Sequence, residues 1–87
     1  MQMYPITRPI FTKNAYYYNA DSDTLAILSH IDKGPISSTY IFTRVAGTSS
    51  VPESKLSFSY SDTLDSWYIV PFFEITKLRS EQPELFI

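Results

Sequence analysis

Residues 56–61 alternate strictly between large apolar side chains and serines, in the order Leu-Ser-Phe-Ser-Tyr-Ser. This period of two is typical of a β-strand with one apolar face and one face in water. Such a strand is stable only where its apolar face packs against a second layer. The chain has 87 residues and no cysteine, so apolar packing must hold one domain together without disulfide bonds. Seven tyrosines, six phenylalanines and one tryptophan supply the aromatic surface for this.

Two more segments have the character of strands. Residues 37–45 are expected to form a strand that is partly covered on both faces, because Tyr40 and Phe42 alternate with other apolar side chains. Residues 67–78 are apolar on both faces, which predicts a central strand. Pro71 predicts a bulge or bend that splits this run, because proline cannot donate to a β-ladder.

Turn-forming residues separate these runs. Residues 32–35 contain a glycine followed by a proline, and residues 47–55 contain serines and a proline. Both segments are therefore expected to interrupt the strands. Residues 62–66 join two strand-like runs, and we expect them to turn a hairpin.

Residues 22–33 fit two structures. Leu25, Leu28 and Ile31 have helical spacing, and the glycine and proline that follow would end a helix. However, Leu25, Ile27 and Ile31 also fit an alternating pattern, and the preceding tyrosines resemble a strand that enters a turn. We favour a short helix, and the strand is the alternative.

Together these segments predict a mainly β fold. We expect a small single-domain antiparallel sheet, or a partly open barrel, of about five strands, with one short helix near residues 22–33. An α+β class is the alternative. The compact domain is expected to span residues 1–78, followed by a C-terminal tail at residues 79–87. Eight large apolar side chains are expected in its core: Tyr40, Phe42, Leu56, Phe58, Trp67, Ile69, Phe73 and Ile75.

Charge and hydropathy exclude several classes of partner. Seven basic residues are spread singly along the chain and nine acidic residues outnumber them, which argues against binding to duplex nucleic acid. The longest apolar run, residues 67–73, is far shorter than the roughly 20 residues that a membrane-spanning helix needs. The N-terminus has neither the basic start nor the long apolar stretch of a secretory signal, so a cytoplasmic protein is expected.

The residue types needed for catalysis and metal binding are scarce. The chain has one histidine, His30, no cysteine and two glycines, which argues against nucleophilic catalysis and phosphate-cradling loops. Asn19, Asp21 and Asp23 alternate like the first ligands of a calcium loop, but Thr24 and His30 occupy the positions that require a glycine and a glutamate. We therefore expect no enzymatic activity, no cofactor and no metal.

Tyrosine is common at protein interfaces because its ring covers a large area while its hydroxyl stays in water. The consecutive tyrosines Tyr16, Tyr17 and Tyr18 are therefore candidates for contact with a partner protein. Stacking of single-stranded bases on aromatic side chains, as in an OB-type barrel, is the alternative. The rings available for stacking are Tyr16, Tyr17, Tyr18, Tyr40, Phe42, Tyr60 and Tyr68.

The C-terminal sequence Gln-Pro-Glu-Leu-Phe, residues 82–86, resembles the Gln-x-x-Leu-Phe peptide with which bacterial polymerases and repair proteins dock on the sliding clamp. The resemblance implies that Leu85 and Phe86 fill an apolar pocket of the clamp while Gln82 forms hydrogen bonds at its rim. The alternative is that Leu85, Phe86 and Ile87 fold back and cap the core of their own domain.

These features favour a non-enzymatic protein-binding module, most simply a small acidic inhibitor or adaptor. Its composition is similar to that of small inhibitors encoded by phages and mobile elements. The candidate partners are a bacterial sliding clamp and a nucleic-acid-handling enzyme whose basic groove attracts an acidic protein. Two alternatives stay open: an OB-type protein that binds single-stranded nucleic acid, and a structural subunit that forms homo-oligomers through its strand edges.

Overall fold

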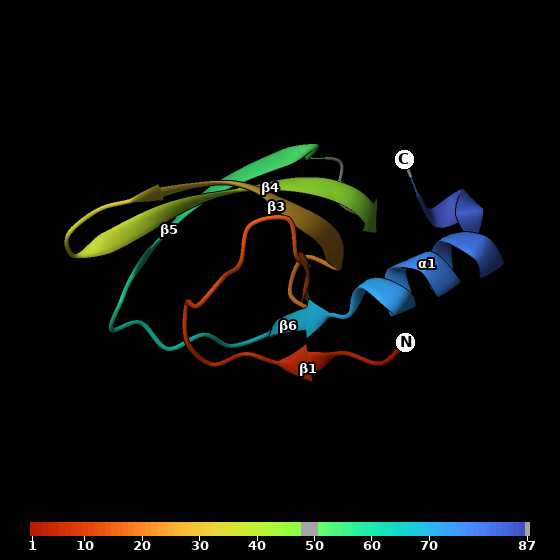
Figure 1. Ribbon diagram of the computed structural model, residues 1–87, viewed down its shortest axis with the longest axis horizontal. Helices are drawn as coiled ribbons and strands as arrows, with labels where there is room; N and C mark the ends of the chain where they lie inside the picture. Colours follow the sequence, from red (N-terminus) through yellow and green to blue (C-terminus); the bar gives the residue numbers. More distant parts are fainter. Residues whose placement is uncertain (48–50, 87) are drawn as a thin grey trace.

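The computed structural model describes residues 1–47 and 51–86. Within them, six strands form one antiparallel sheet in the order β1-β6-β2-β3-β4-β5, and one α-helix and one 3₁₀-helix follow the last strand (Figure 1). This confirms the prediction of a mainly β domain with an antiparallel sheet. The elements are β1 (Tyr4–Pro5), β2 (Tyr16–Asn19), β3 (Thr24–Lys33), β4 (Ser37–Gly47), β5 (Glu53–Ser59), β6 (Trp67–Val70), α1 (Phe72–Glu81) and η1 (Pro83–Leu85).

The two longest strands, β3 and β4, form a hairpin at one end of the molecule. The predicted break at residues 32–35 is confirmed, because β3 ends at Lys33 and the N–H of Gly34 donates to the carbonyl of Ser37 at 2.9 Å. A Cβ atom at position 34 would lie 2.7 Å from that same oxygen, so the tight turn requires glycine. The predicted strand at residues 37–45 lies within β4. The predicted strand at residues 56–61 overlaps β5, which begins at Glu53, inside the predicted loop, and ends at Ser59.

The preference for a helix at residues 22–33 is wrong, since this range contains the whole of β3, which pairs with both β2 and β4. The register of β3 against β4 shifts between Leu28 and His30. In a regular strand, residues three apart face opposite sides. The extra residue in this β-bulge, Ser29, places Leu28 and Ile31 on the same face, and both pack in the same cluster. Their helix-like spacing of three residues is therefore produced by the bulge.

The prediction of a hairpin turn at residues 62–66 is also wrong. β5 lies at one edge of the sheet and β6 lies near the other, so the segment between them crosses beneath the sheet (Figure 1). Leu64 on this crossing is buried, and its N–H donates to the carbonyl of Thr7 at 2.8 Å. The crossing segment thereby adds to the layer that covers the sheet.

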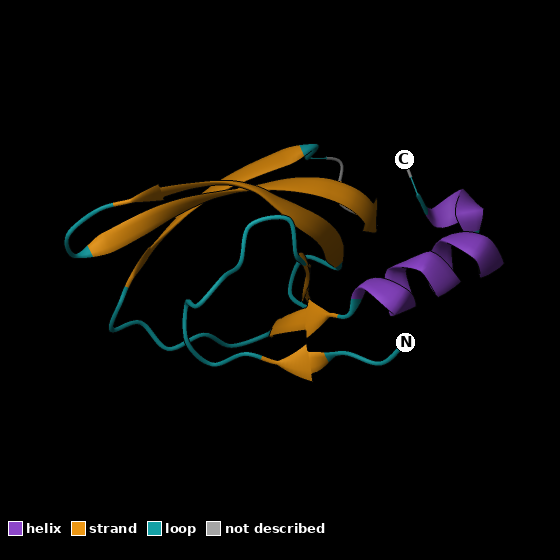
Figure 2. Cartoon of the chain, viewed as in Figure 1, coloured by secondary structure: helices purple, strands orange, loops and turns teal. Residues whose placement is uncertain are grey.

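Pro71 divides the apolar run at residues 67–78, as predicted, but only its first part is a strand. β6 ends at Val70, and α1 begins directly after Pro71, which precedes the first helical residue without a side-chain cap. Figure 2 shows α1 and η1 at the end of the sheet away from the β3–β4 turn. Ile75 is 1% exposed and packs against the outer face of the sheet, whereas Phe73, which was predicted in the core, is 60% exposed.

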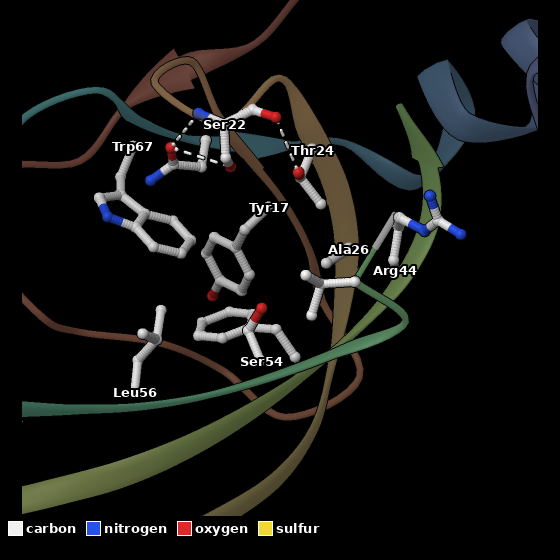
Figure 3. A pocket seen from close by; sticks show the side chains of 11 residues that line it. Tyr17, Ser22, Thr24, Ala26, Arg44, Ser54, Leu56 and Trp67 are labelled. Carbon is white, nitrogen blue, oxygen red and sulfur yellow. Dashed lines mark hydrogen bonds between the residues drawn. The ribbon is translucent and has the colours of Figure 1, made fainter. Parts of the chain in front are cut away.

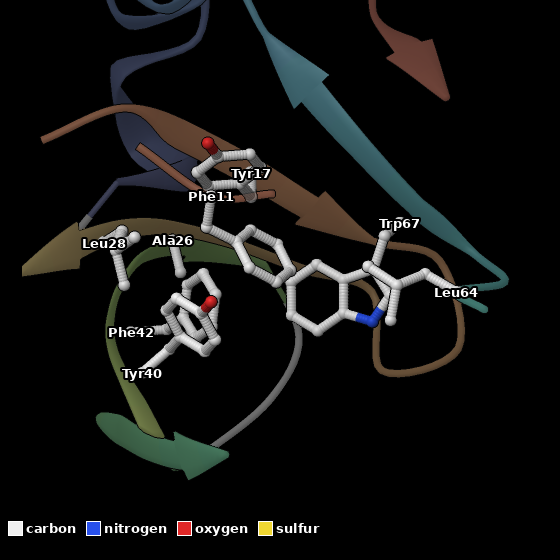
Figure 4. Packing of buried hydrophobic residues seen from close by; sticks show 8 residues of the cluster. All are labelled: Phe11, Tyr17, Ala26, Leu28, Tyr40, Phe42, Leu64 and Trp67. Carbon is white, nitrogen blue, oxygen red and sulfur yellow. The ribbon is translucent and has the colours of Figure 1, made fainter. Parts of the chain in front are cut away.

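The inner face of the sheet is covered by the segment between β1 and β2. Phe11 on this segment lies between the rings of Tyr17, Trp67 and Phe42 (Figure 4), with centroid distances of 4.9, 5.4 and 5.3 Å and edge-to-face geometry. Hydrogen bonds fix the segment, since the Thr12 N–H donates to the Tyr17 hydroxyl oxygen at 2.7 Å. The buried residues of this inner cluster are Phe11, Tyr17, Ala26, Leu28, Tyr40, Phe42, Leu64 and Trp67.

Most of the predicted core is confirmed. The buried members are Tyr40, Phe42, Trp67 and Ile75. Three others are partly buried and pack against the inner cluster: Leu56, Phe58 and Ile69. The prediction missed Phe11, because its segment has no periodic pattern that would mark it as part of the core.

We expect Phe11→Ala to lower the free energy of unfolding by about 3–5 kcal/mol, the usual cost of removing a buried phenylalanine ring. Ile10→Ala is the matched control, because Ile10 is the adjacent residue but is 78% exposed. Its effect should stay within about 0.5 kcal/mol. Urea denaturation of both variants, followed by circular dichroism, measures the difference. Equal losses in the two variants would contradict the role of Phe11.

Candidate functional site

The three consecutive tyrosines of β2 face opposite sides of the sheet. Tyr17 points to the inner face, is 1% exposed and belongs to the inner cluster, so it is a core residue and not a contact surface. Tyr16 and Tyr18 lie on the outer face, are partly exposed and pack against the cluster beneath α1. The alternation of a strand thus separates a run that sequence reasoning had treated as one site.

Tyr18 lies beside Tyr68 on the outer face, with ring centroids 6.4 Å apart. Its hydroxyl donates to the Oδ1 atom of Asp23 at 2.6 Å. This hydrogen bond, together with partial burial and the negative charge of Asp23, raises the pKa of the Tyr18 phenol above its ordinary value. The contact also holds the turn between β2 and β3, where Asp23 has a left-handed φ of 47°.

A hollow of about 330 Å³ opens where β2, β6 and the start of α1 meet. We call it the aromatic cleft. Phe72 is 71% exposed at its rim and lies 6.2 Å from the ring of Tyr16, and Tyr4 on β1 is 47% exposed. Phe73 is exposed on the adjacent position of α1. The cleft is lined by Tyr4, Asn14, Ala15, Tyr16, Ile69, Val70, Pro71 and Phe72.

A second hollow, which we call the inner cavity, has a volume of about 340 Å³. It opens on the inner face of the sheet and shares no lining residue with the aromatic cleft. Figure 3 shows Tyr17 and Trp67 facing this space, and Arg44 across from them with its guanidinium turned away from the rings. The lining residues are Tyr17, Asn19, Ser22, Thr24, Ala26, Phe42, Arg44, Val51, Ser54, Leu56 and Trp67.

The C-terminal segment resembling a clamp-binding peptide is placed against the domain. Gln82 is exposed and its N–H donates to the carbonyl of Leu78 at 2.7 Å, which closes the end of α1. Leu85 is 46% exposed, whereas Phe86 is partly buried and forms a β-bridge with Ala46. The guanidinium of Arg79 lies 4.8 Å from the centre of the Phe86 ring. The expected boundary at residue 78 falls inside α1, and Ile87 lies outside the described residues.

The aromatic rings that were candidates for base stacking are divided between the two faces. Tyr17, Tyr40 and Phe42 are buried, and all three pack around Phe11 on the inner face. Tyr60 is 49% exposed near the β3–β4 turn, where its hydroxyl donates to the carbonyl of Gly34 at 2.7 Å. The buried rings on the inner face therefore do not form an exposed surface on which successive bases could stack.

The side chains of the acidic turn at residues 19–23 form hydrogen bonds within the protein. The Oδ1 atom of Asn19 accepts from the N–H of Ser22 at 3.0 Å, and that of Asp21 accepts from the hydroxyl of Ser66 at 3.0 Å. In residues 1–47 and 51–86, no three histidine, aspartate or glutamate side chains gather as a metal site would require. His30 is exposed on β3. None of the helices in the described part of the chain has the length and apolar character to span a membrane.

Comparison with known proteins does not place the chain in a family. No protein-family model matches the sequence, and neither curated proteins nor solved structures give a match. The two hollows and the C-terminal segment are therefore the features from which a function has to be inferred. Sequence reasoning had singled out Tyr16 but missed Phe72 and Tyr4, although two phenylalanines directly after a proline at a helix start were a visible signal.

We expect Asp23→Asn to lower the pKa of Tyr18, because the variant loses the negative charge that stabilises the protonated phenol, and the amide oxygen of asparagine is a weaker acceptor than a carboxylate. Since the folded pKa is raised, the stabilisation from this pair is fully present below the unfolded pKa, near 10, and is lost as pH rises through the folded value. Titration of the Tyr18 ring carbon by NMR measures the shift. Asp21→Asn is the control, because Asp21 binds Ser66 instead. A Tyr18 pKa that is unchanged in Asp23→Asn contradicts this assignment.

Proposed function

We propose that this chain is a non-enzymatic protein-binding module, an adaptor or inhibitor, whose contact surface is the aromatic cleft. The observation that carries the proposal is the exposure of Phe72 and Phe73 beside a hollow large enough to receive a side chain. Exposed apolar side chains gathered at a concave surface are typical of protein interaction sites.

The packing of α1 does not account for these two phenylalanines. The helix uses Glu74 and Ile75 as its buried residues, and Leu78 packs on the same outer cluster. Phe72 and Phe73 therefore remain largely exposed, with Phe72 at the rim of the cleft beside Tyr16. Burial of each ring against a partner would contribute about 1.5–3 kcal/mol, which is the scale of an interface hot spot.

The proposed partner inserts an apolar side chain between Tyr4, Tyr16 and Phe72. Tyr4 and Tyr16 supply rings with hydroxyl groups, which suits the rim of an interface because one end of the side chain remains in water. The cleft lining contains no charged residue among those described, so the central contact is apolar. The hydrogen-bonded strand pair of β2 and β6 forms the floor, which limits the conformational entropy lost on binding.

The C-terminal peptide is a weaker basis for the same function. To dock on a sliding clamp as the resemblance implies, Phe86 would have to leave Ala46 and Arg79, whereas the aromatic cleft is accessible without any rearrangement. The clamp and a nucleic-acid-handling enzyme remain proposed partner classes, and an inhibitor could reach either through the cleft.

We expect Phe72→Ser combined with Phe73→Ser to weaken capture of the partner by more than tenfold, as loss of a hot spot does. The intact chain and the variant would be used as baits in lysates of the source cell and its host, with bound proteins quantified by mass spectrometry. Ile36→Ser is the matched control, because Ile36 is 74% exposed at the distant β3–β4 turn.

Gln82→Ala combined with Leu85→Ala tests the peptide separately, since both side chains are exposed and their loss leaves the core intact. The cleft proposal predicts that this variant retains the partner. If it loses the partner while the Phe72 and Phe73 variant keeps it, the docking element is the C-terminal peptide and the cleft proposal is overturned.

A further inference from the structure

The inner cavity has features of a small-molecule site that are independent of the aromatic cleft. Its volume of about 340 Å³ lies within the range of ligand pockets. Phe11 packs against the rings of Tyr17, Phe42 and Trp67 but does not line the cavity, which lies beside these rings toward Arg44 and Ser54. Three aromatic rings along one space favour a planar aromatic occupant, because rings pack well edge to face or offset from one another.

The amide of Asn19 offers hydrogen-bond donors to the cavity. The Oδ1 atom of Asn19 already accepts from the N–H and the hydroxyl of Ser22, at 3.0 and 3.2 Å, which leaves the amide N–H groups of Asn19 for another acceptor. The hydroxyl of Thr24 donates to the carbonyl of Ser22 at 3.1 Å (Figure 3). The hydrogen of the Thr24 hydroxyl is therefore already used, whereas an acceptor oxygen on a ligand could pair with the amide N–H groups of Asn19.

Arg44 gives the cavity its charge. Among the described residues that line the cavity, it is the one with a charged side chain. Its Nε atom is closed off from water, and residues 1–47 and 51–86 offer it no hydrogen-bond partner. A buried donor without an acceptor is rare in folded proteins and calls for an explanation. An anionic group bound at the opening would supply the charge opposite to that of the guanidinium.

We propose that the inner cavity binds a small aromatic carboxylate. The ring would lie in the cavity against Tyr17, Phe42 and Trp67, on the side that Phe11 does not occupy, and the carboxylate would lie at the opening beside Arg44. Neither Asp nor Glu lines the described part of the cavity to repel it. This site is separate from the aromatic cleft, so a ligand here could bind whether or not a partner protein occupies the cleft.

The chain carries its own reporter, because its one tryptophan, Trp67, lines the cavity. The test is titration of the intact protein with benzoate, and separately with benzyl alcohol as the neutral analogue, followed by the indole N–H resonance of Trp67 in NMR spectra. We expect a saturable shift with benzoate. Arg44→Met should weaken benzoate binding by about tenfold, the scale of one lost charged hydrogen bond, and should change benzyl alcohol binding by less than about twofold.

Ser54→Leu fills the cavity from β5 and should abolish binding of both compounds. Ser57→Leu is the matched control, because Ser57 is exposed on the opposite face of the same strand. If Ser54→Leu does not fold, Val51→Phe, at a lining residue that is 52% exposed, provides the second way to fill the space. The proposal is overturned if benzoate gives no saturable shift, if Arg44→Met leaves its affinity unchanged, or if binding persists in the filled variants.

Discussion

The insertion of Phe11 into the inner face of the sheet is the contact on which the rest of the fold depends. A single antiparallel sheet cannot bury its own apolar face and needs a second layer. Here the second layer is an irregular segment, held where the N–H of Asn14 donates to the carbonyl of Leu28 at 2.8 Å and the hydroxyl of Tyr40 donates to the carbonyl of Pro9 at 3.2 Å. Without Phe11, five neighbouring aromatic residues would each lose a ring contact that they now make with the same side chain.

Local patterns in the sequence were sufficient for the fold class but not for the topology. The alternation at residues 56–61 and the turn at Gly34 depend on neighbours in the chain, and both were predicted correctly. The position of β6 beside β2 depends on a crossing segment whose bond from Leu64 to Thr7 joins residues far apart in sequence, and the local pattern at residues 62–66 instead predicts a hairpin. The bulge at Ser29 likewise gives β3 the spacing of a helix, because one inserted residue changes which apolar side chains share a face.

The candidate sites were less predictable than the fold, because exposure is decided by tertiary packing. The tyrosines of β2 are identical in type, yet Tyr17 is buried and Tyr16 lines the aromatic cleft. Phe73 resembles a core residue in sequence, but Pro71 starts a helix and turns this side chain outward. In the sequence, nothing distinguishes Arg44 from the other dispersed basic residues. Its significance comes from a buried Nε atom, which only three-dimensional packing reveals.

Strand β2 contributes to both hollows, so the register of this strand fixes the position of both. Tyr16 lines the aromatic cleft and Tyr17 lines the inner cavity, so adjacent residues of β2 serve opposite faces. Their positions are set by the register in which Tyr16 pairs with Val70 and Tyr17 pairs with Ile69. A slip of one residue would exchange the faces and destroy both hollows. Phe11 opposes such a slip, because it holds the Tyr17 ring on the inner side. The core contact that stabilises the sheet therefore also preserves both candidate sites.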